Sequence, residues 1–187
     1  MSMTPSLYSP RRRVFLGALA SLAAVPPLAA GAGSDGLHDW GIAPDFRGIA
    51  KWFNSPALSL AQLRGQIVLV DFWTHACINC LRTLPHVNRW AATYRKQGLV
   101  VVGVHTPEFA FERSAGNVQA AIKRYGIAHP VAMDNDYATW RAYDNRYWPA
   151  HYLVDGQGRI RYRHFGEGDY ERTEAAIHAL LTRPGRA

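Results

Sequence analysis

The two cysteines of the chain, Cys77 and Cys80, are separated by two residues, a spacing that lets the thiols act together as a redox dithiol. They follow an apolar stretch, residues 67–73, with the composition of a buried strand. Apolar residues at helical spacing then continue over residues 81–97. We therefore predict that the pair opens a helix with Cys77 at its exposed end. There, free N–H groups and the positive end of the helix dipole favour a nucleophilic thiolate.

Two structural uses of the pair are less well supported. A disulfide that closes so short a loop stabilises a domain by only roughly 2 kcal/mol, and a chain of 187 residues can bury a full core without it. A zinc site needs further ligands, and the sequence has no other cysteine to supply them. We therefore expect a redox dithiol that uses no metal and no bound cofactor.

Composition indicates one compact domain and a mixed, solvated surface. The formal net charge is +7, but three arginines lie together at positions 11–13 in a segment without acids. The net charge from residue 33 onward is only +4, and it comes from scattered residues without a long basic run. We expect a monomer that does not bind nucleic acid.

Residues 1–32 have the pattern of an export signal. Arginines precede an apolar stretch of about a dozen residues that ends at Val25, well short of the roughly 20 residues needed to span a bilayer. Two prolines and the small residues ending at Ala32 follow, so we predict cleavage after Ala32, with an uncleaved anchor as the alternative. Arg12 and Arg13 before Val-Phe-Leu resemble a twin-arginine signal, although Arg11 replaces the usual Ser or Thr. We expect residues 33–187 to form a domain that is periplasmic or otherwise extracytoplasmic.

Strand and helix signals alternate along this domain. Strands are expected at residues 67–73, 99–104, 130–133, 150–154 and 159–164, and helices at residues 81–97, 118–125, 137–143 and 170–181. Asp136 is the expected cap of the third helix, and Asp155-Gly-Gln-Gly indicates a hairpin turn. This order predicts an α/β fold with a central mixed sheet, helices on both faces and an antiparallel edge.

Several motifs carry a family resemblance. They are Asp-Phe-Trp-Thr-His-Ala-Cys-Ile-Asn-Cys from Asp71, Gly-Val-His-Thr-Pro-Glu-Phe from Gly103, and Trp148-Pro149-Ala150 before a strand. With these motifs the chain resembles thioredoxin-like proteins, most closely the exported thiol-disulfide oxidoreductases of the DipZ and TlpA types. The resemblance implies a thioredoxin-like fold with the extra strand and helix of TlpA-type proteins.

The resemblance also assigns roles around the dithiol. It implies that Cys77 attacks a disulfide and that Cys80 resolves the mixed disulfide. Asp71, the single charge in an apolar strand, would take the proton from Cys80 if it is buried, and would be an ordinary strand-end acid if it is solvated. Pro149 matches a cis-proline that faces the dithiol and presents backbone groups to the substrate chain.

Three further residues are candidates for substrate binding: Trp73, Trp148 and Glu108. Trp73 matches an active-site tryptophan but is equally compatible with core packing. Glu108 matches an acid that lines the site in TlpA-like reductases. It is also compatible with a plain helix start, in which Thr106 is the cap.

The residues between the cysteines bear on the direction of the reaction. Neither Ile78 nor Asn79 is charged, and neither is a histidine. We therefore expect a reductase of protein disulfides rather than a strong oxidant. The resemblance suggests a membrane thiol donor of the CcdA type. It also suggests oxidised exported proteins or apocytochrome c as substrates, which would place the chain in cytochrome c biogenesis.

Two other functions remain open at this point. Thr74 lies three residues before Cys77, as in peroxiredoxins, but Val70 occupies the proline position of that motif, so a thiol peroxidase has weak support. Copper carriage would use both cysteines with a histidine such as His75 or His151.

Overall fold

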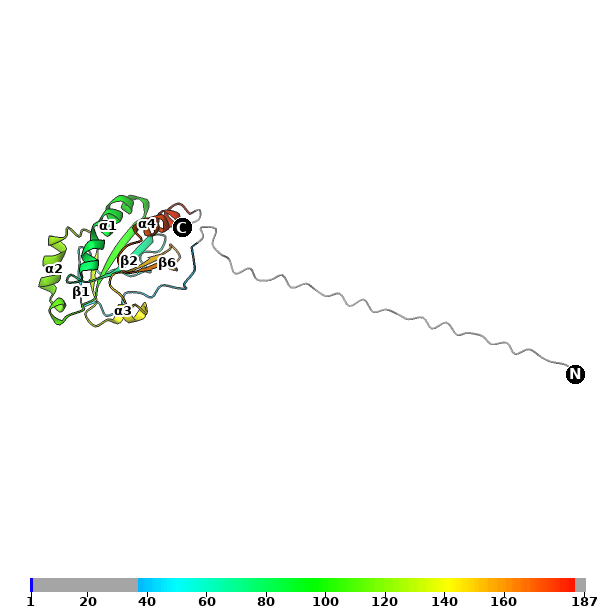
Figure 1. The fold of residues 1–187 in the computed structure, drawn as a ribbon, viewed down its shortest axis with the longest axis horizontal. Coiled ribbons are helices and arrows are strands. Elements are labelled where there is room, and N and C mark those ends of the chain that lie inside the picture. Colours follow the sequence, from blue (N-terminus) through cyan, green and yellow to red (C-terminus); the bar gives the residue numbers. More distant parts are fainter. Residues whose placement is uncertain (2–36, 184–187) are drawn as a thin grey trace. The chain divides into compact units, whose positions relative to one another are not determined.

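The computed structural model describes residue 1 and residues 37–183. The expected export signal and its boundary at residue 33 therefore lie outside the described residues, except for Met1. Residues 37–183 form a six-stranded sheet with helices on both faces (Figure 1). No helix within the described part of the chain is long and apolar enough to cross a membrane.

The sheet is mixed, as predicted. Its strands are β1 (Lys51–Phe53), β2 (Ile67–Trp73), β3 (Leu99–His105), β4 (Val131–Met133), β5 (Ala150–Val154) and β6 (Ile160–Phe165), in the order β1-β4-β3-β2-β5-β6. β3 is parallel to β2 and β4, whereas the remaining pairs are antiparallel. Every residue of β2 is buried, because this continuous apolar strand has neighbours on both sides and helices on both faces.

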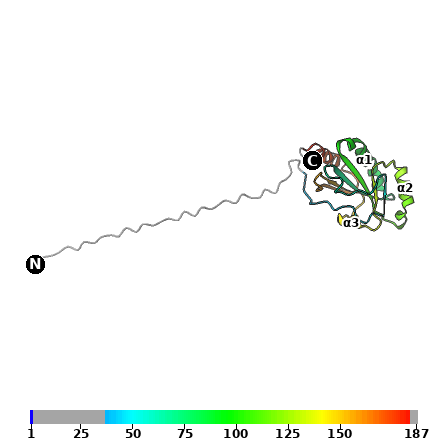
Figure 2. The same cartoon turned by 180° about the vertical axis from the view of Figure 1, so that it is seen from behind.

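The helices are α1 (Ile78–Tyr94), α2 (Ala115–Arg124), α3 (Ala138–Ala142) and α4 (Tyr170–Leu181). Short 3-10 helices cover Arg95–Gln97 and Ala110–Arg113. α2 and β4 lie between β3 and α3 in the sequence. α1 and α4 cover one face of the sheet, and α3 lies on the opposite side, also when the molecule is seen from behind (Figure 2).

Side-chain alternation along β2 divides the core between these two faces. Ile67 and Leu69 pack with residues of α1 and α4, and Trp73 packs beside Cys80. Val68, Val70 and Phe72 point to the other face, toward the aromatic residues of α3. Asp71 therefore projects on the same side as α1, beneath the helix that carries the cysteines.

The structure corrects some local predictions. β1 was not predicted, because three residues are too few to show a periodic pattern. Tyr137, rather than Asp136, is the N-cap residue of α3, and the Asp134 carboxylate accepts hydrogen bonds from the backbone N–H groups of Thr139 and Trp140. No helix starts at Thr106; the next α-helix, α2, begins after Ser114, which caps it.

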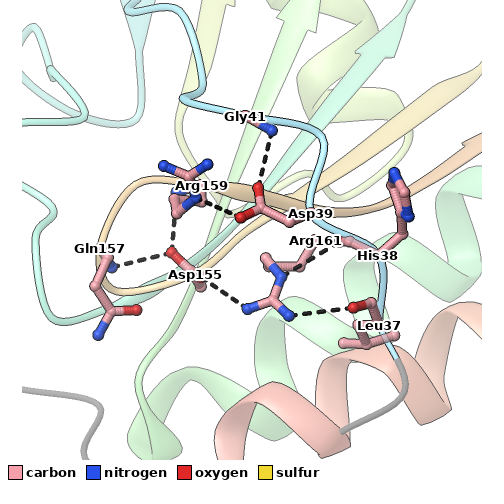
Figure 3. A network of polar contacts seen from close by, with 8 residues as sticks. All are labelled: Leu37, His38, Asp39, Gly41, Asp155, Gln157, Arg159 and Arg161. Atoms are coloured by element: carbon pink, nitrogen blue, oxygen red, sulfur yellow. Dashed lines mark hydrogen bonds and ion pairs between the residues drawn. The ribbon is translucent and has the colours of Figure 1, made fainter. Parts of the chain in front are cut away.

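Polar contacts fix the start of the domain to the hairpin of β5 and β6 (Figure 3). The buried Arg161 lies 3.3 Å from the Asp155 carboxylate and donates to the carbonyls of Leu37 and His38. Asp155 also accepts hydrogen bonds from the backbone N–H groups of Gln157 and Arg159, which closes the predicted turn. This end of the sheet is thereby held in place, and β5 is positioned for the site described next.

Candidate active site

The two cysteines differ sharply in environment. Cys77 is half-buried at the N-cap position of α1, and Cys80 is only 1% exposed, one turn into the helix. Both are free thiols. A hydrogen bond from the Cys80 thiol, supported by the backbone N–H groups of Cys80 and Asn79, lowers the pKa of Cys77 to about 6. Burial raises the pKa of Cys80 far above its usual range. Cys77 is therefore the more readily ionised and more accessible thiol, and Cys80 is a shielded one.

The loop before β5 faces Cys77. The Cys77 sulfur lies 3.9 Å from the main-chain carbonyl oxygen of Trp148, and the Trp148–Pro149 peptide bond is cis. The indole N–H of Trp148 donates to the carbonyl of Thr106, and its ring lies 4.1 Å from the ring of Trp140, centroid to centroid. These two contacts hold the Trp148–Pro149 segment against the dithiol.

A shallow groove of about 650 Å³ lies beside this segment. It is lined by Asn79, Arg146, Tyr147, Trp148, Phe165 and Gly166. Tyr147 and Phe165 are 55% and 41% exposed, and Ile78, next to Cys77, is 58% exposed. The surface around Cys77 is thus open and combines exposed apolar side chains with polar ones, which suits contact with a polypeptide.

Asp71 is buried, with 1% of the residue exposed. Its interpretation as a proton acceptor for Cys80 required this burial. Its carboxylate oxygen lies 3.2 Å from Nε2 of His151 on the neighbouring strand β5. Its charge acts on Cys80 and is one of the influences that raise the pKa of that thiol. Asp71 and Cys80 therefore share one buried, low-dielectric space.

Glu112 is the residue that sequence reasoning missed. It is fully buried, and its carboxylate accepts hydrogen bonds from the hydroxyl of Thr74 and from three backbone N–H groups, those of Ala76, Glu108 and Phe109. Burial alone would raise the pKa of Glu112, but these donors hold it below its usual range. The loop that ends at Cys77 is thereby tied to the segment after β3. No local pattern in the sequence signals this role, because Glu112 simply follows Phe109, Ala110 and Phe111.

The substrate-binding candidates fare differently. Trp148 lines the groove. Trp73 is 1% exposed, so it packs in the core and the expectation that it binds substrate does not fit its burial. Glu108 is exposed and does not lie at the start of an α-helix. Its negative charge opposes the lowering of the Cys77 pKa, so Glu108 is close enough to influence the site electrostatically.

The described residues contain one group with metal-ligand character: His75, His105 and Glu112. Neither cysteine belongs to it, and both oxygens of Glu112 already accept two hydrogen bonds each. The ligand atoms of the three residues lie within 4.8 Å of one another, and the rings of His75 and His105 stack with 19° between their planes. Glu112 instead holds the loop before Cys77 in place through these hydrogen bonds. His151 lies beside Asp71 rather than beside the thiols. Copper carriage by the cysteines with either histidine is not supported.

The contacts of Thr74 do not support the peroxidase alternative. The Thr74 hydroxyl donates to Glu112 and lies 3.4 Å from Nε2 of His105, so it is engaged away from Cys77.

Comparisons with known proteins agree with this geometry. The chain is 51% identical over 160 residues to the protein DipZ of Mycobacterium tuberculosis, which covers 81% of this chain and 23% of DipZ. The chain thus spans about a quarter of the length of that relative. It is 28% identical to the thiol-disulfide oxidoreductase YkuV of Bacillus subtilis, covering 74% of this chain and 93% of YkuV.

Solved structures show the same fold. A crystal structure of a thioredoxin-like superfamily protein superposes with a TM-score of 0.71 at 28% identity, covering 76% of this chain and 97% of the other. A protein from Chlorobium tepidum described as a thiol:disulfide interchange protein DsbE superposes with a TM-score of 0.68 at 28% identity, covering 78% and 99%. Residues 42–163 match the model of the AhpC/TSA family. The chain therefore belongs to the AhpC/TSA family and has its thioredoxin-like fold.

Proposed function

We propose that this protein is an extracytoplasmic thiol-disulfide oxidoreductase that reduces disulfide bonds of exported proteins through Cys77 and Cys80. The observation that carries the proposal is the asymmetry of the dithiol. One thiol has a lowered pKa and faces the Trp148 carbonyl beside an open groove, while the other is buried one turn away. This asymmetry is what a two-step thiol exchange requires. The names of YkuV and of ResA, a second Bacillus subtilis relative at 27% identity, support the class of enzyme.

The first step uses the thiolate of Cys77. It attacks one sulfur of the client disulfide, so that a mixed disulfide forms and the other client sulfur leaves as a thiolate. The client segment is expected to lie along the groove beside Trp148 and Pro149, with backbone groups of that segment as its polar partners. Ile78, Tyr147 and Phe165 offer apolar contact around it.

The second step uses Cys80. Asp71 takes the proton of the Cys80 thiol, and the resulting thiolate attacks the Cys77 sulfur. The bond between Cys77 and the client breaks and the client leaves as its second thiolate. The client has then gained two electrons, and the Cys77–Cys80 disulfide has lost them. An exported thiol donor must restore the dithiol, and a membrane protein of the CcdA type is the partner we propose.

Export by the twin-arginine route is part of this proposal, with apocytochrome c among the possible clients. Replacing Arg12 and Arg13 by lysine should block export and leave residues 37–183 folded, because the guanidinium groups serve as an address and lie outside the domain. Cell fractionation measures the outcome. Normal extracytoplasmic accumulation of the double variant would assign the chain to the general secretory route.

Client trapping tests the proposed function directly. The Cys80→Ser variant should accumulate mixed disulfides with exported proteins, because Cys77 can attack but nothing resolves the product. The Cys77→Ser variant is the matched control and should trap few clients. Equal trapping by both variants, or turnover of hydrogen peroxide that exceeds the rate of thiol exchange, would overturn the assignment.

A further inference from the structure

The register of the sheet aligns ionisable side chains in one row that crosses three strands. Asp71 of β2 lies opposite His151 of β5, and His151 lies opposite His164 of β6. Directly paired residues in a sheet project on the same face, so all three side chains lie on the side covered by α1. The row begins beneath Cys80 and ends at the strand on the edge of the sheet.

Burial decreases along this row. The side chains of Asp71 and His151 are 2% and 1% exposed, and that of His164 is 13% exposed. His151 Nε2 lies 3.2 Å from the Asp71 carboxylate, which is the one ion pair of Asp71 among the described residues. The ring centroids of His151 and His164 are 6.1 Å apart. His164 Nδ1 in turn lies 3.8 Å from the exposed carboxylate of Asp169.

Within the described part of the chain, Nδ1 of His151 and Nε2 of His164 make no hydrogen bond, and the ion pair with Asp71 is the polar contact of His151 Nε2. The imidazole of His151 is therefore buried between an acid and a second imidazole, with its Nδ1 not engaged as a donor or acceptor. A buried polar group without a partner costs stability, so its retention calls for a role. The ring of Trp90 on α1 covers His151 edge-on at 5.9 Å, which closes the row from above.

The second step of the proposed reaction needs such a row. Asp71 and Cys80 are both 1% exposed, so a proton taken up by Asp71 has no direct access to water. The proton must nevertheless leave before the next turnover, and it must return when the disulfide is reduced again. Imidazole accepts a proton at one nitrogen and releases it at the other, which makes it suited to this transfer.

We propose that His151 and His164 are positioning residues that carry the proton between Asp71 and solvent, an inference that rests on the proposed thiol exchange. Protonated Asp71 passes its proton to Nε2 of His151, His151 releases a proton toward His164, and His164 exchanges with water near Asp169. When the protein disulfide is reduced, the same route returns one proton to Cys80. No electrons move along the row.

Other ionisable groups lie near this row and interact electrostatically with its members. Cys80 lies near Asp71 from α1, and the charge of Asp71 also acts on the buried His129, whose Nε2 lies beside Gly103 of β3. At the edge, burial lowers the pKa of His164, and the charge of His151 lowers it further. The carboxylate of Asp169 opposes this lowering.

A two-phase assay separates the proposed relay from the proposed function. An aromatic disulfide reagent that releases a coloured thiolate is mixed with the reduced protein. Attack by Cys77 releases the first thiolate, and resolution by Cys80 releases the second. His164→Gln should leave the first phase unchanged. It should slow the second phase about tenfold and increase its solvent deuterium isotope effect. His151→Gln should slow the second phase about a hundredfold.

Matched controls keep the outcome decisive. His86→Gln replaces a half-buried histidine on α1 that stacks on Tyr170 outside the row, and it should leave both phases unchanged. Circular dichroism verifies folding, and His164→Gln tests the route even if His151→Gln unfolds. A second phase that is unaffected by His164→Gln overturns the relay, also when His151→Gln slows it, because His151 would then serve only as a partner of Asp71. Loss of the first phase in the wild-type protein would instead contradict the proposed function.

Discussion

The sulfur of Cys77 lies 3.9 Å from the main-chain carbonyl oxygen of Trp148, at the end of the loop that leads into β5. Two segments about 70 residues apart in the sequence thus meet at the nucleophile: the start of α1 and the Trp148–Pro149 bond. One segment supplies a thiolate, and the other supplies backbone groups and an exposed groove.

Alkylation should distinguish the two thiols. In a short pulse of iodoacetamide on the reduced protein, Cys77 alone should be labelled, with a rate that rises with pH around a midpoint near 6, where its thiol ionises. Cys80 should stay unlabelled, because burial both shields it and raises its pKa. Mass mapping gives the labelled positions, and the unfolded protein, which should label at both thiols, is the control. Equal labelling of the folded protein would remove the roles assigned here.

Glu112 and Glu108 should differ in their effect on stability. Glu112→Gln leaves backbone N–H groups of a buried loop without an acceptor and should lower the free energy of unfolding by about 1–3 kcal/mol. Glu108→Gln is the matched control, since its side chain is exposed, and should change stability by less than about 0.5 kcal/mol. It should also lower the pKa of Cys77 slightly, because a repelling charge is removed. Urea titrations of both variants measure the difference, and similar losses would show that Glu112 is not an anchor.

Acid should destabilise the fold through two buried histidines. Burial lowers the pKa of His129 to about 4, and burial together with the charge of His75 lowers that of His105 to about 4. Between about pH 4 and 6.5 the unfolded chain binds more protons at these two sites than the folded chain does. Their contribution to stability is therefore complete above about pH 6.5 and is lost as the pH falls, by up to about 1.4 kcal/mol per pH unit for each site.

The variant His129→Phe tests this account of acid sensitivity. It removes one titrating group while keeping a ring of similar shape, so the slope of unfolding free energy against pH should fall by about one proton between pH 4 and 6.5. Denaturant titrations over that range measure the slope. A slope identical to that of the wild-type protein would mean that His129 is not kept neutral in the fold.

The sequence was sufficient to predict the thioredoxin-like fold and the placement of the dithiol. Continuous apolar runs predicted β2 and β3, and helical spacing after Cys80 predicted α1, because these signals are local and long. The burial of Asp71 was one of the two outcomes expected from the sequence, since a continuous apolar strand has no solvent-exposed side on which its single charged residue could lie. The resemblance carried the family assignment, which the comparisons confirm.

Tertiary contacts decided the features that the sequence did not predict. Glu112 accepts hydrogen bonds from donors up to 38 positions away in the sequence. His151 lies opposite Asp71 because of the register in which β5 pairs with β2. No local pattern encodes either contact. The same holds for Asp134, whose carboxylate accepts hydrogen bonds from two backbone N–H groups in the first turn of α3, where the sequence predicted a contribution from Asp136. Trp73 was ambiguous in the sequence for the same reason: a strand residue's face is known, but what covers that face is not.

The direction of the reaction follows from how strongly Cys77 favours its thiolate. A stabilised thiolate makes a dithiol more oxidising, and a pKa of about 6 lies nearer to the value of about 7 in thioredoxin than to the value of about 3.5 in the strongest oxidant of this fold. The negative charge of Glu108 opposes further stabilisation of the thiolate. We therefore expect a reductase.

The reduction potential of the Cys77–Cys80 pair tests this account most directly. The protein is equilibrated with a series of glutathione redox buffers, and its free thiols are then trapped and counted. The account predicts a potential closer to about −270 mV than to about −120 mV, the two ends of the range known for such dithiols. A potential above about −160 mV would contradict it, because a dithiol that oxidising would donate its disulfide to clients rather than reduce theirs.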